Sequence, residues 1–321
     1  MLRNRSTATA APKTAPFSPL ASGAAQLIPD FRGAKTGYRS SRWRLWLPDN
    51  VPMPDGSTWR YSFKANYPVL RFRGGAASTP QGNENDTLPT IKAAITAGQI
   101  PPCIAIYPDM RDPAPYAGTA ETWGMNCANG TYPYEDVIQY DMPELLRARC
   151  RTLARPEDFA DVGFSAGGMQ VLRSRAKFDT KGAKVHVVLG APRLDADLGG
   201  AGAAYNNWTA AEKTKIFNDS QQWCQRQIPI SSSAGIGLFN TVGAGIAPLL
   251  MLESDPGDAT AANSMNNAIN TRLPALSVAF TTVNLDNAGH TPTHNLALYM
   301  AAWVAEETNH LGWMVTNGWG T

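Results

Sequence analysis

The sequence predicts an α/β fold in which a mostly parallel central sheet is covered by helices on both faces. Short apolar runs alternate with longer amphipathic stretches, as strands and helices do when they follow one another along a chain. Of the 321 residues, 43% are hydrophobic, which is enough for one large core, and only 17% are charged. The 28 glycines and 24 prolines indicate a compact domain with many loops.

Seven apolar runs are the expected strands, and five amphipathic stretches are the expected helices. The strands are predicted at residues 42–47, 67–72, 103–107, 159–164, 184–189, 248–252 and 276–283. The helices are predicted at residues 88–97, 137–153, 166–178, 260–272 and 293–309. No internal repeat is visible in the sequence.

The chain is expected to contain a flexible leader, residues 1–35, followed by a single folded domain, residues 36–321. The first thirty residues are rich in Ala, Ser, Thr and Pro and contain no continuous apolar stretch, so no secretory signal is visible. Residues 195–247 interrupt the alternation of strands and helices. We expect a lid or insertion there, over the carboxyl edge of the sheet where ligands bind in open α/β folds. The alternative is a helical decoration packed on the side.

Charge and cysteine content exclude several function classes. The net charge is +2 with no Lys/Arg run, so no nucleic-acid partner is expected, and no apolar stretch approaches the roughly 20 residues of a membrane span. The cysteines show no CxxC spacing, which argues against a metal or redox motif. Cys103 and Cys150 are interpreted as buried apolar residues. Cys127 and Cys224 fall in expected loops, and the sequence does not decide whether they form a disulfide. It does not decide the oligomeric state either.

The motif GFSAGG at residues 163–168 predicts a nucleophile at Ser165. It lies between the expected strand at 159–164 and the expected helix at 166–178, the context in which a G-x-S-x-G match has meaning. A nucleophile on so tight a turn is lifted clear of the sheet, and glycines are needed where the backbone passes close to its neighbours. The N–H of Ala166, at the start of the helix, is an expected donor to a developing oxyanion.

A second oxyanion donor is expected upstream, after the expected strand at 67–72. The sequence there continues as RGGAAS, and glycine lets bare backbone approach a substrate carbonyl. The N–H of Gly75 is the predicted donor, with Gly74 and Ala76 as alternatives.

A serine hydroxyl needs a base within hydrogen-bond reach, and the chain has four histidines. Where a nucleophile elbow carries the serine, the triad follows the chain order serine, acid, histidine, which favours His290, in the loop before the last expected helix. His294 is the second choice for the base. His186, inside an apolar run, is interpreted as a packed core residue, and His310 as a residue at the end of the last helix.

The acid is expected after the strand that precedes the histidine loop. Two aspartates follow that strand in the sequence MLESDPGD, Asp255 near the strand end and Asp258 just before the expected helix at 260–272. Asp258 also has the position of a helix N-cap, a role that aspartate fills well. From the position alone, both residues stay open as the partner that would orient the imidazole.

These segments together resemble the esterase branch of the α/β hydrolases. That branch includes feruloyl and acetyl-xylan esterases, S-formylglutathione hydrolase, enterochelin esterases and mycolyltransferases. The resemblance covers most of residues 38–310 and is carried by the segments RWRLWLPDN, YPVLRFRGG, IAIYPDMRD, YEDVIQYDMPELL, GFSAGG and AGH.

The resemblance bears on two site residues. Many esterases have a His-Gly-Gly sequence at the point where this chain has Arg73 followed by its glycine pair. The histidine of those esterases is generally a structural support, so the resemblance implies that Arg73 replaces a structural residue. In similar esterases the acid often ends a Gly-x-x-Asp turn. MLESDPGD matches this turn if Asp255 replaces the glycine, so the resemblance favours Asp258 as the acid and keeps Asp255 as the alternate.

The resemblance implies a serine carboxylic-ester hydrolase that forms an acyl-enzyme on Ser165 and needs no cofactor and no metal. Its expected partner is an ester substrate, aryl or acetyl and linked to a carbohydrate, and a secreted location is favoured. Aromatic residues in segments expected around the pocket would suit such an ester: Trp123, Tyr132, Tyr134, Trp208 and Trp223. The alternatives are an acyltransferase of the same fold and a non-catalytic binding protein on a decayed hydrolase fold.

Overall fold

The structure is a computed structural model that describes residues 16–28, 31–37, 39–40, 42–76, 78–109, 123–128, 133–152, 159–178, 183, 185–192, 194, 208–220, 224, 249–284 and 289–290. The start of the expected leader, most of the expected insertion at 195–247 and the expected helix at 293–309 lie outside these residues.

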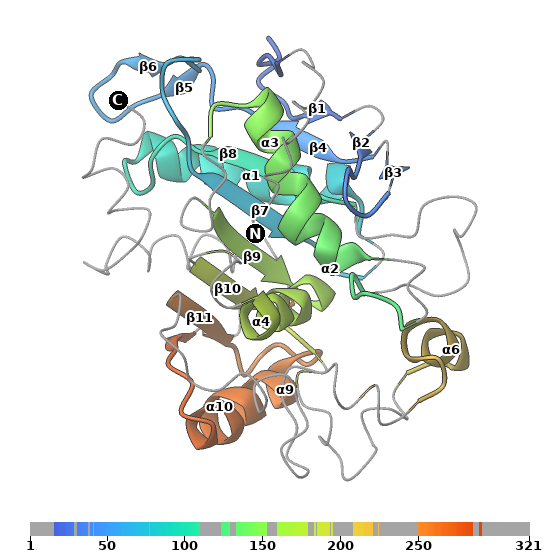
Figure 1. The fold of residues 1–321 in the computed structure, drawn as a ribbon. Coiled ribbons are helices and arrows are strands. Elements are labelled where there is room, and N and C mark those ends of the chain that lie inside the picture. Colours follow the sequence, from blue (N-terminus) through green and yellow to red (C-terminus); the bar gives the residue numbers. More distant parts are fainter. Residues whose placement is uncertain are drawn as a thin grey trace, which may run out of the picture.

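The described residues form an eight-stranded sheet (Figure 1). Its order is β1 (Gln26–Leu27), β4 (Arg44–Trp46), β8 (Ile104–Tyr107), β7 (Val69–Arg73), β9 (Phe159–Phe164), β10 (Val185–Leu189), β11 (Leu249–Ser254) and β12 (Thr281–Asn284). The pairs β1–β4 and β4–β8 are antiparallel, and every other neighbouring pair is parallel. The prediction of a mostly parallel sheet is therefore confirmed. Two small hairpins join β2 (Phe31–Arg32) to β3 (Arg39–Ser40) and β5 (Val51–Pro52) to β6 (Thr58–Trp59).

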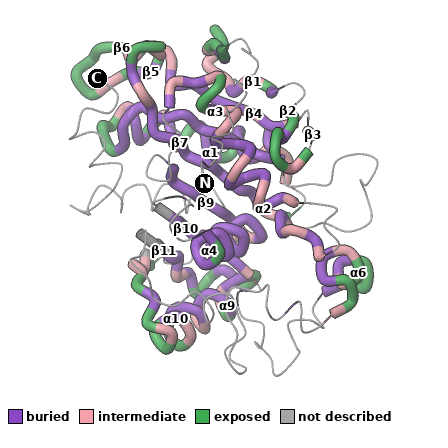
Figure 2. The backbone as a smooth tube through the Cα atoms, viewed as in Figure 1, coloured by how far each residue is buried: buried purple, intermediate pink, exposed green. Residues whose placement is uncertain are grey.

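Helices cover both faces of the sheet. On one face α1 (Pro80–Thr96) packs on alternate strand residues such as Leu70 and Phe72. The other face carries α2 (Tyr134–Asp136), the π-helical stretch η1 (Val137–Asp141), α3 (Met142–Arg149), α4 (Ala166–Phe178) and α9 (Ala262–Asn267). Figure 1 shows α3 and α4 in front of the sheet. Every residue of α4 except Lys177 is buried (Figure 2), which makes it the central helix of this face.

Several predicted boundaries shift for local reasons. The helix expected at 260–272 is observed as α9, the π-helical stretch η3 (Ala268–Arg272) and α10 (Leu273–Ala275). The strand expected from residue 276 begins only at Thr281, because Ser277 adopts φ +56° in a turn after α10. Inside the expected insertion, α6 (Ala210–Phe217) is a helix that starts at a capping box formed by Thr209 and Glu212.

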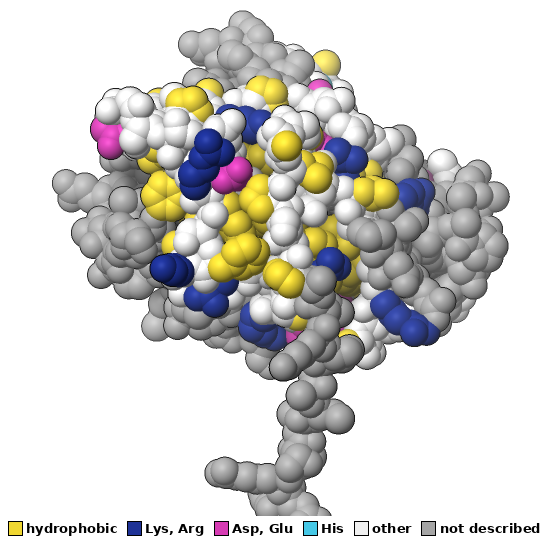
Figure 3. All heavy atoms as spheres, turned by 90° about the horizontal axis from the view of Figure 1, so that it is seen from above, with side chains coloured by type: hydrophobic (Ala, Val, Ile, Leu, Met, Phe, Trp, Pro, Cys, Tyr) yellow, Lys and Arg dark blue, Asp and Glu magenta, His cyan; other side chains and the backbone are white. Residues whose placement is uncertain are grey.

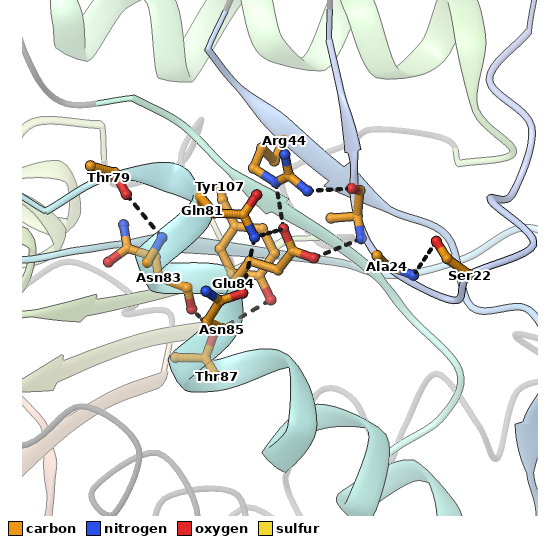
Figure 4. A network of polar contacts seen from close by, with 12 residues as sticks. Ser22, Ala24, Arg44, Thr79, Gln81, Asn83, Glu84, Asn85, Thr87 and Tyr107 are labelled. Atoms are coloured by element: carbon orange, nitrogen blue, oxygen red, sulfur yellow. Dashed lines mark hydrogen bonds and ion pairs between the residues drawn. The ribbon is translucent and has the colours of Figure 1, made fainter.

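The expected start of α1 at residue 88 is wrong by two turns. The helix begins at Pro80, capped by the Thr79 side chain, which accepts a hydrogen bond from the Gly82 N–H. Its first turns contain Asn83 and Glu84, polar residues that interrupt the apolar periodicity and yet are buried. Figure 4 shows the polar contacts of this part of the helix, in which Arg44 and Gln81 both reach the Glu84 carboxylate.

Glu84 also explains why the expected leader is too long. Its Oε1 accepts a hydrogen bond from the Ala25 N–H at 2.8 Å, and its Oε2 pairs with Arg44, which donates in turn to the Ala25 carbonyl at 2.7 Å (Figure 4). The segment before residue 35 thus contributes β1 to the sheet, and Phe17 and Ile28 are buried. Residues 16–28, expected in the leader, therefore belong to the folded domain.

All four cysteines lie in the described part of the chain, and each is a buried thiol. Cys127 and Cys224, whose pairing the sequence does not decide, therefore form no disulfide. Burial raises the pKa of Cys103, Cys127 and Cys150 to about 12, so these thiols stay protonated at neutral pH. The interpretation of Cys103 and Cys150 as buried apolar residues is confirmed.

No described helix is long and apolar enough to cross a membrane. On the face of the molecule seen from above, the described basic side chains stand scattered among apolar and neutral ones and do not gather in one patch (Figure 3).

Charged side chains occupy the sheet face beneath α4, where a core is normally apolar. Arg71, Asp161 and His186 lie in register on the adjacent strands β7, β9 and β10, and all are less than 2% exposed. Arg71 pairs with Asp161, and among the described residues neither ring nitrogen of His186 has a hydrogen-bond partner. Burial, with Arg175 and Arg73 nearby, lowers the pKa of His186 to about 3, so the ring is neutral.

This buried ring predicts a loss of stability in mild acid. Between pH 6.5 and about 3 the unfolded chain binds a proton at residue 186 that the folded chain excludes, so stability falls as the pH drops through this window. We expect His186 to contribute a loss of about 2 kcal/mol in unfolding free energy between pH 6.5 and pH 5. Urea unfolding at the two pH values measures it.

The control is His186→Leu, which leaves no polar partner stranded because the ring makes no hydrogen bond to any residue that the structure describes. This variant should lose about 2 kcal/mol less than the wild type over the same pH interval. Equal losses in the two proteins would show that His186 does not cause the acid sensitivity.

Candidate active site

Ser165 lies on the turn between β9 and α4 with φ +56°, a left-handed conformation that serine seldom adopts. The turn is held from outside, because the Ser165 N–H donates to the Leu189 carbonyl at the end of β10 at 2.9 Å. Strain of this kind persists only where the surroundings enforce it, and it is typical of functional turns. The structure therefore places Ser165 on the sharp elbow that its motif predicts.

The glycines on either side of Ser165 are required by close backbone contacts. A Cβ on Gly163 would overlap the Gly167 carbonyl, and a Cβ on Gly167 would overlap the carbonyl of Arg73 at the end of β7. Strand β9, helix α4 and the end of β7 are thus packed backbone to backbone around the serine. No side chain fits between them.

Gly75 faces the serine across a short gap. A Cβ on Gly75 would lie 3.2 Å from the Ser165 Cβ and 3.6 Å from its Oγ. Ser78 pins the loop, since its N–H and its hydroxyl both donate to the Gly75 carbonyl, at 3.2 and 2.8 Å. Ala166 begins α4 on the other side of the serine and is buried. The two predicted oxyanion donors therefore flank Ser165.

His290 is hydrogen-bonded to Asp258, with 2.8 Å between Nδ1 and Oδ2. The ring packs on Phe164, the residue before the serine, at a centroid distance of 4.5 Å. The Asp258 side chain is 2% exposed, and its Oδ1 accepts from the N–H groups of Thr260 and Ala261 at 2.9 and 3.0 Å. Asp258 thus fills both roles considered from the sequence: one oxygen caps the turn into α9 and the other holds the imidazole.

Asp255 contacts the histidine loop without reaching the ring. Its Oδ2 accepts from the Gly289 N–H at 2.7 Å, and its Oδ1 from the Gly257 N–H at 2.8 Å. Gly289 has φ +73°, which suits glycine, so this hydrogen bond fixes the backbone immediately before His290. The two aspartates therefore have different contacts: Asp258 is hydrogen-bonded to the His290 ring, and Asp255 is hydrogen-bonded to the backbone of the preceding residue, Gly289.

Gly190 completes the site and was not found from the sequence. It follows β10 with φ +48°, and a Cβ there would lie 2.8 Å from Asp258 Oδ2 and 3.2 Å from His290 Nδ1. The bare backbone of Gly190 therefore forms the floor beneath the histidine and aspartate pair. Its signal in the sequence was a glycine directly after a strand next to the elbow strand.

The structure shows packing contacts for three of the aromatic residues predicted around the pocket, and their role in substrate binding stays a prediction. Trp208 is 2% exposed and packs against Phe217 and Trp123 at centroid distances of 5.1 and 5.0 Å. Trp123 is half-buried and donates its Nε1–H to Glu212 at 2.7 Å, and the Tyr134 ring is buried with its hydroxyl on the Asp109 carbonyl. Trp208 and Trp123 pack in the cluster that contains the apolar residues of α6, and Tyr134 packs in a separate cluster with residues of η1.

The remaining candidates fall in two groups. His186 is fully buried, as expected for a packed core residue. Tyr132, Trp223, His294 and His310 lie outside the described residues. Within the described part of the chain, no group of three or more His, Cys, Asp or Glu side chains could hold a metal ion.

No protein-family model matches the sequence, and no curated protein matches it. Solved structures do match. A ferulic acid esterase from the anaerobic fungus Anaeromyces mucronatus has a TM-score of 0.57 at 16% identity, over 86% of this chain and 88% of that one. An S-formylglutathione hydrolase from Agrobacterium tumefaciens has a TM-score of 0.60 at 11% identity, over 89% and 93%. The chain has the α/β-hydrolase fold.

A third structure of this fold, the fluorophosphonate-binding serine hydrolase F of Staphylococcus aureus, has a TM-score of 0.58 at 15% identity, over 91% of this chain and 99% of that one. In an α/β hydrolase the serine, acid and histidine follow strands of the sheet in that order along the chain. Here Ser165 follows β9, Asp258 follows β11 and His290 follows β12. Because these strands are parallel, their carboxyl ends meet at one edge of the sheet.

Proposed function

We propose that the protein is a serine carboxylic-ester hydrolase with Ser165 as nucleophile, His290 as general base and Asp258 as the acid that orients the base. One observation carries the proposal: the strained serine elbow lies against Gly75 on one side, and the hydrogen-bonded pair of Asp258 and His290 packs on Phe164 at its base. An inert turn would need neither the strain nor the buried carboxylate on the imidazole.

The proposed reaction is acyl transfer in two steps. The Ser165 Oγ attacks the ester carbonyl carbon while His290 Nε2 takes the hydroxyl proton, and the N–H groups of Gly75 and Ala166 donate to the oxyanion that forms. As the tetrahedral intermediate collapses, the bond to the alkoxy oxygen breaks and His290 returns the proton to the leaving alcohol. Water, deprotonated by His290, then attacks the acyl-enzyme and releases the acid and Ser165. Asp258 stabilises the imidazolium in each step.

For the substrate we propose an aryl or acetyl ester linked to a carbohydrate. Support comes from the solved structures of the same fold, among which a ferulic acid esterase was determined in complex with ferulic acid, at 14% identity. The tryptophans in the described residues do not add support, because they pack in the core.

Labelling with a fluorophosphonate probe tests the proposed function. Attack by the Ser165 Oγ on phosphorus expels fluoride and leaves a stable phosphonyl ester on the serine. We expect the wild type to be labelled once, on the peptide that contains residue 165, and Ser165→Ala not to be labelled. An unlabelled but folded wild type, or labelling that persists in Ser165→Ala, would contradict the proposal. A panel of acetyl, hydroxycinnamoyl and simple alkyl esters then ranks the acyl groups. If the enzyme hydrolyses neither acetyl nor hydroxycinnamoyl esters faster than simple alkyl esters, the proposed substrate is wrong.

A further inference from the structure

Arg73 stands directly before the loop that carries Gly75, at the end of β7, and is 1% exposed. Its guanidinium contacts two other elements. Nη2 pairs with Asp161 Oδ2 of β9 at 2.6 Å, and Nη1 donates to the Ser174 hydroxyl of α4 at 2.7 Å and to the Gln170 carbonyl of α4 at 3.2 Å. The side chain therefore joins the end of β7 to the helix that begins at Ala166.

The main chain of Arg73 makes a second attachment to the same helix. Its carbonyl oxygen lies where a Cβ on Gly167 would be, and the Gly74 carbonyl lies 2.6 Å from that position. The end of β7 thus rests on the first turn of α4 through its backbone and on later turns through the guanidinium. These two elements hold the two expected oxyanion donors, Gly75 after β7 and Ala166 at the start of α4.

We propose that Arg73 is a positioning residue that fixes the separation of Gly75 and Ala166, and thereby the geometry of the oxyanion hole. This inference rests on the proposed function of Ser165. An oxyanion hole acts through donors held in place before the reaction, and a displacement of about 1 Å is enough to cost roughly 100-fold in rate. A guanidinium that ties the two donor-bearing elements together supplies that rigidity.

The attachment is a charged one. Burial would raise the pKa of Asp161, but Arg71 and Arg73 outweigh it and hold that pKa below its ordinary value, so the carboxylate stays ionised between the two guanidinium groups. Hydrogen bonds between ionised groups are shorter and stronger than neutral ones. Lysine, which has a single cationic nitrogen and no fork, could not reach Asp161 and α4 with the same geometry.

Arg71 provides a matched control. It is as buried as Arg73 and pairs with the same carboxylate, but its Nη1 donates to the Ile138 carbonyl of η1 at 3.0 Å. Within the described residues its hydrogen bonds go to β9 and η1, and none goes to α4. Removing Arg71 should therefore disturb stability in the same way as removing Arg73 while leaving the oxyanion loop tied to the nucleophile helix.

The test compares Arg73→Met, Arg73→Lys and Arg71→Met on a soluble ester, with kcat and KM measured separately and normalised to the folded fraction. We expect kcat of Arg73→Met to fall about 100-fold with KM within about threefold of wild type, since the hole acts on the transition state. Arg73→Lys should recover part of kcat, and Arg71→Met should keep kcat within about threefold. Affinity for a boronic acid, whose serine adduct is tetrahedral, should fall with kcat in Arg73→Met alone.

Equal losses of kcat in Arg73→Met and Arg71→Met, or a loss confined to KM, would overturn the positioning role. If Arg73→Met does not fold, Ser174→Ala decides, because it removes one hydrogen bond from Arg73 Nη1. A fall in kcat of about fivefold supports the role, and an unchanged kcat overturns it. Failure of the proposed function is distinguished by the wild type, which would then show neither turnover nor labelling at Ser165.

Discussion

Asp258→Asn is expected to lower kcat about 10⁴-fold while leaving the protein folded. In the proposed mechanism Asp258 Oδ2 accepts the Nδ1–H of His290, at 2.8 Å, which leaves Nε2 able to take the proton of Ser165. The amide of asparagine can turn its NH₂ group toward Nδ1, which favours the opposite tautomer and removes the charge that stabilises the imidazolium. Steady-state kinetics on a soluble ester measures the loss, and circular dichroism checks the fold.

Asp255→Asn is the matched control, three residues away on the same turn. An asparagine carbonyl can still accept from the Gly289 N–H that Asp255 Oδ2 holds now. We expect a loss of no more than about tenfold in kcat, since a neutral acceptor holds the loop less firmly than a carboxylate. If Asp255→Asn lost more activity than Asp258→Asn, the assignment of the acid would be reversed.

This pair of aspartates marks what the sequence could and could not decide. The serine was found because its elbow is a local feature, a strand, a turn and a helix within about twenty residues. The choice between Asp255 and Asp258 was not local, because it depends on how a turn after β11 faces a loop some thirty residues later. Either carboxylate could have met the ring, and the structure brings both to the histidine loop, one to the ring and one to the backbone.

The fold was predictable where burial is apolar and unpredictable where it is polar. Strand β9 and helix α4 match their predicted ranges, because a continuous apolar run and an amphipathic stretch are both read correctly from periodicity. The first turns of α1 were missed because Glu84 is buried by partners about 40 and 59 residues away. The charges under α4 were missed for the same reason, since Arg71 meets Asp161 from 90 residues away.

Gly167→Ala is expected to destabilise the fold by about 3 kcal/mol or more and to lower kcat as well. The new Cβ would overlap the carbonyl oxygens of Arg73 and Gly74, which are main-chain atoms that cannot turn aside. The end of β7 must then move away from α4, and this movement carries Gly75 away from Ser165. Thermal unfolding should show a midpoint lowered on the order of 10 °C.

Gly82→Ala is the control for Gly167→Ala, because it makes the same chemical change near the start of a helix. Its Cβ would meet the Thr79 side chain at 3.3 Å, and alanine favours the helix, so we expect a stability within about 1 kcal/mol of wild type and an unchanged kcat. If Gly167→Ala behaved like Gly82→Ala, the end of β7 would not be packed on α4 as the structure has it. The oxyanion geometry inferred from that packing, including the role of Arg73, would then be wrong. A Gly167→Ala protein that folds but has a low kcat would instead show that this one backbone contact sets the position of Gly75.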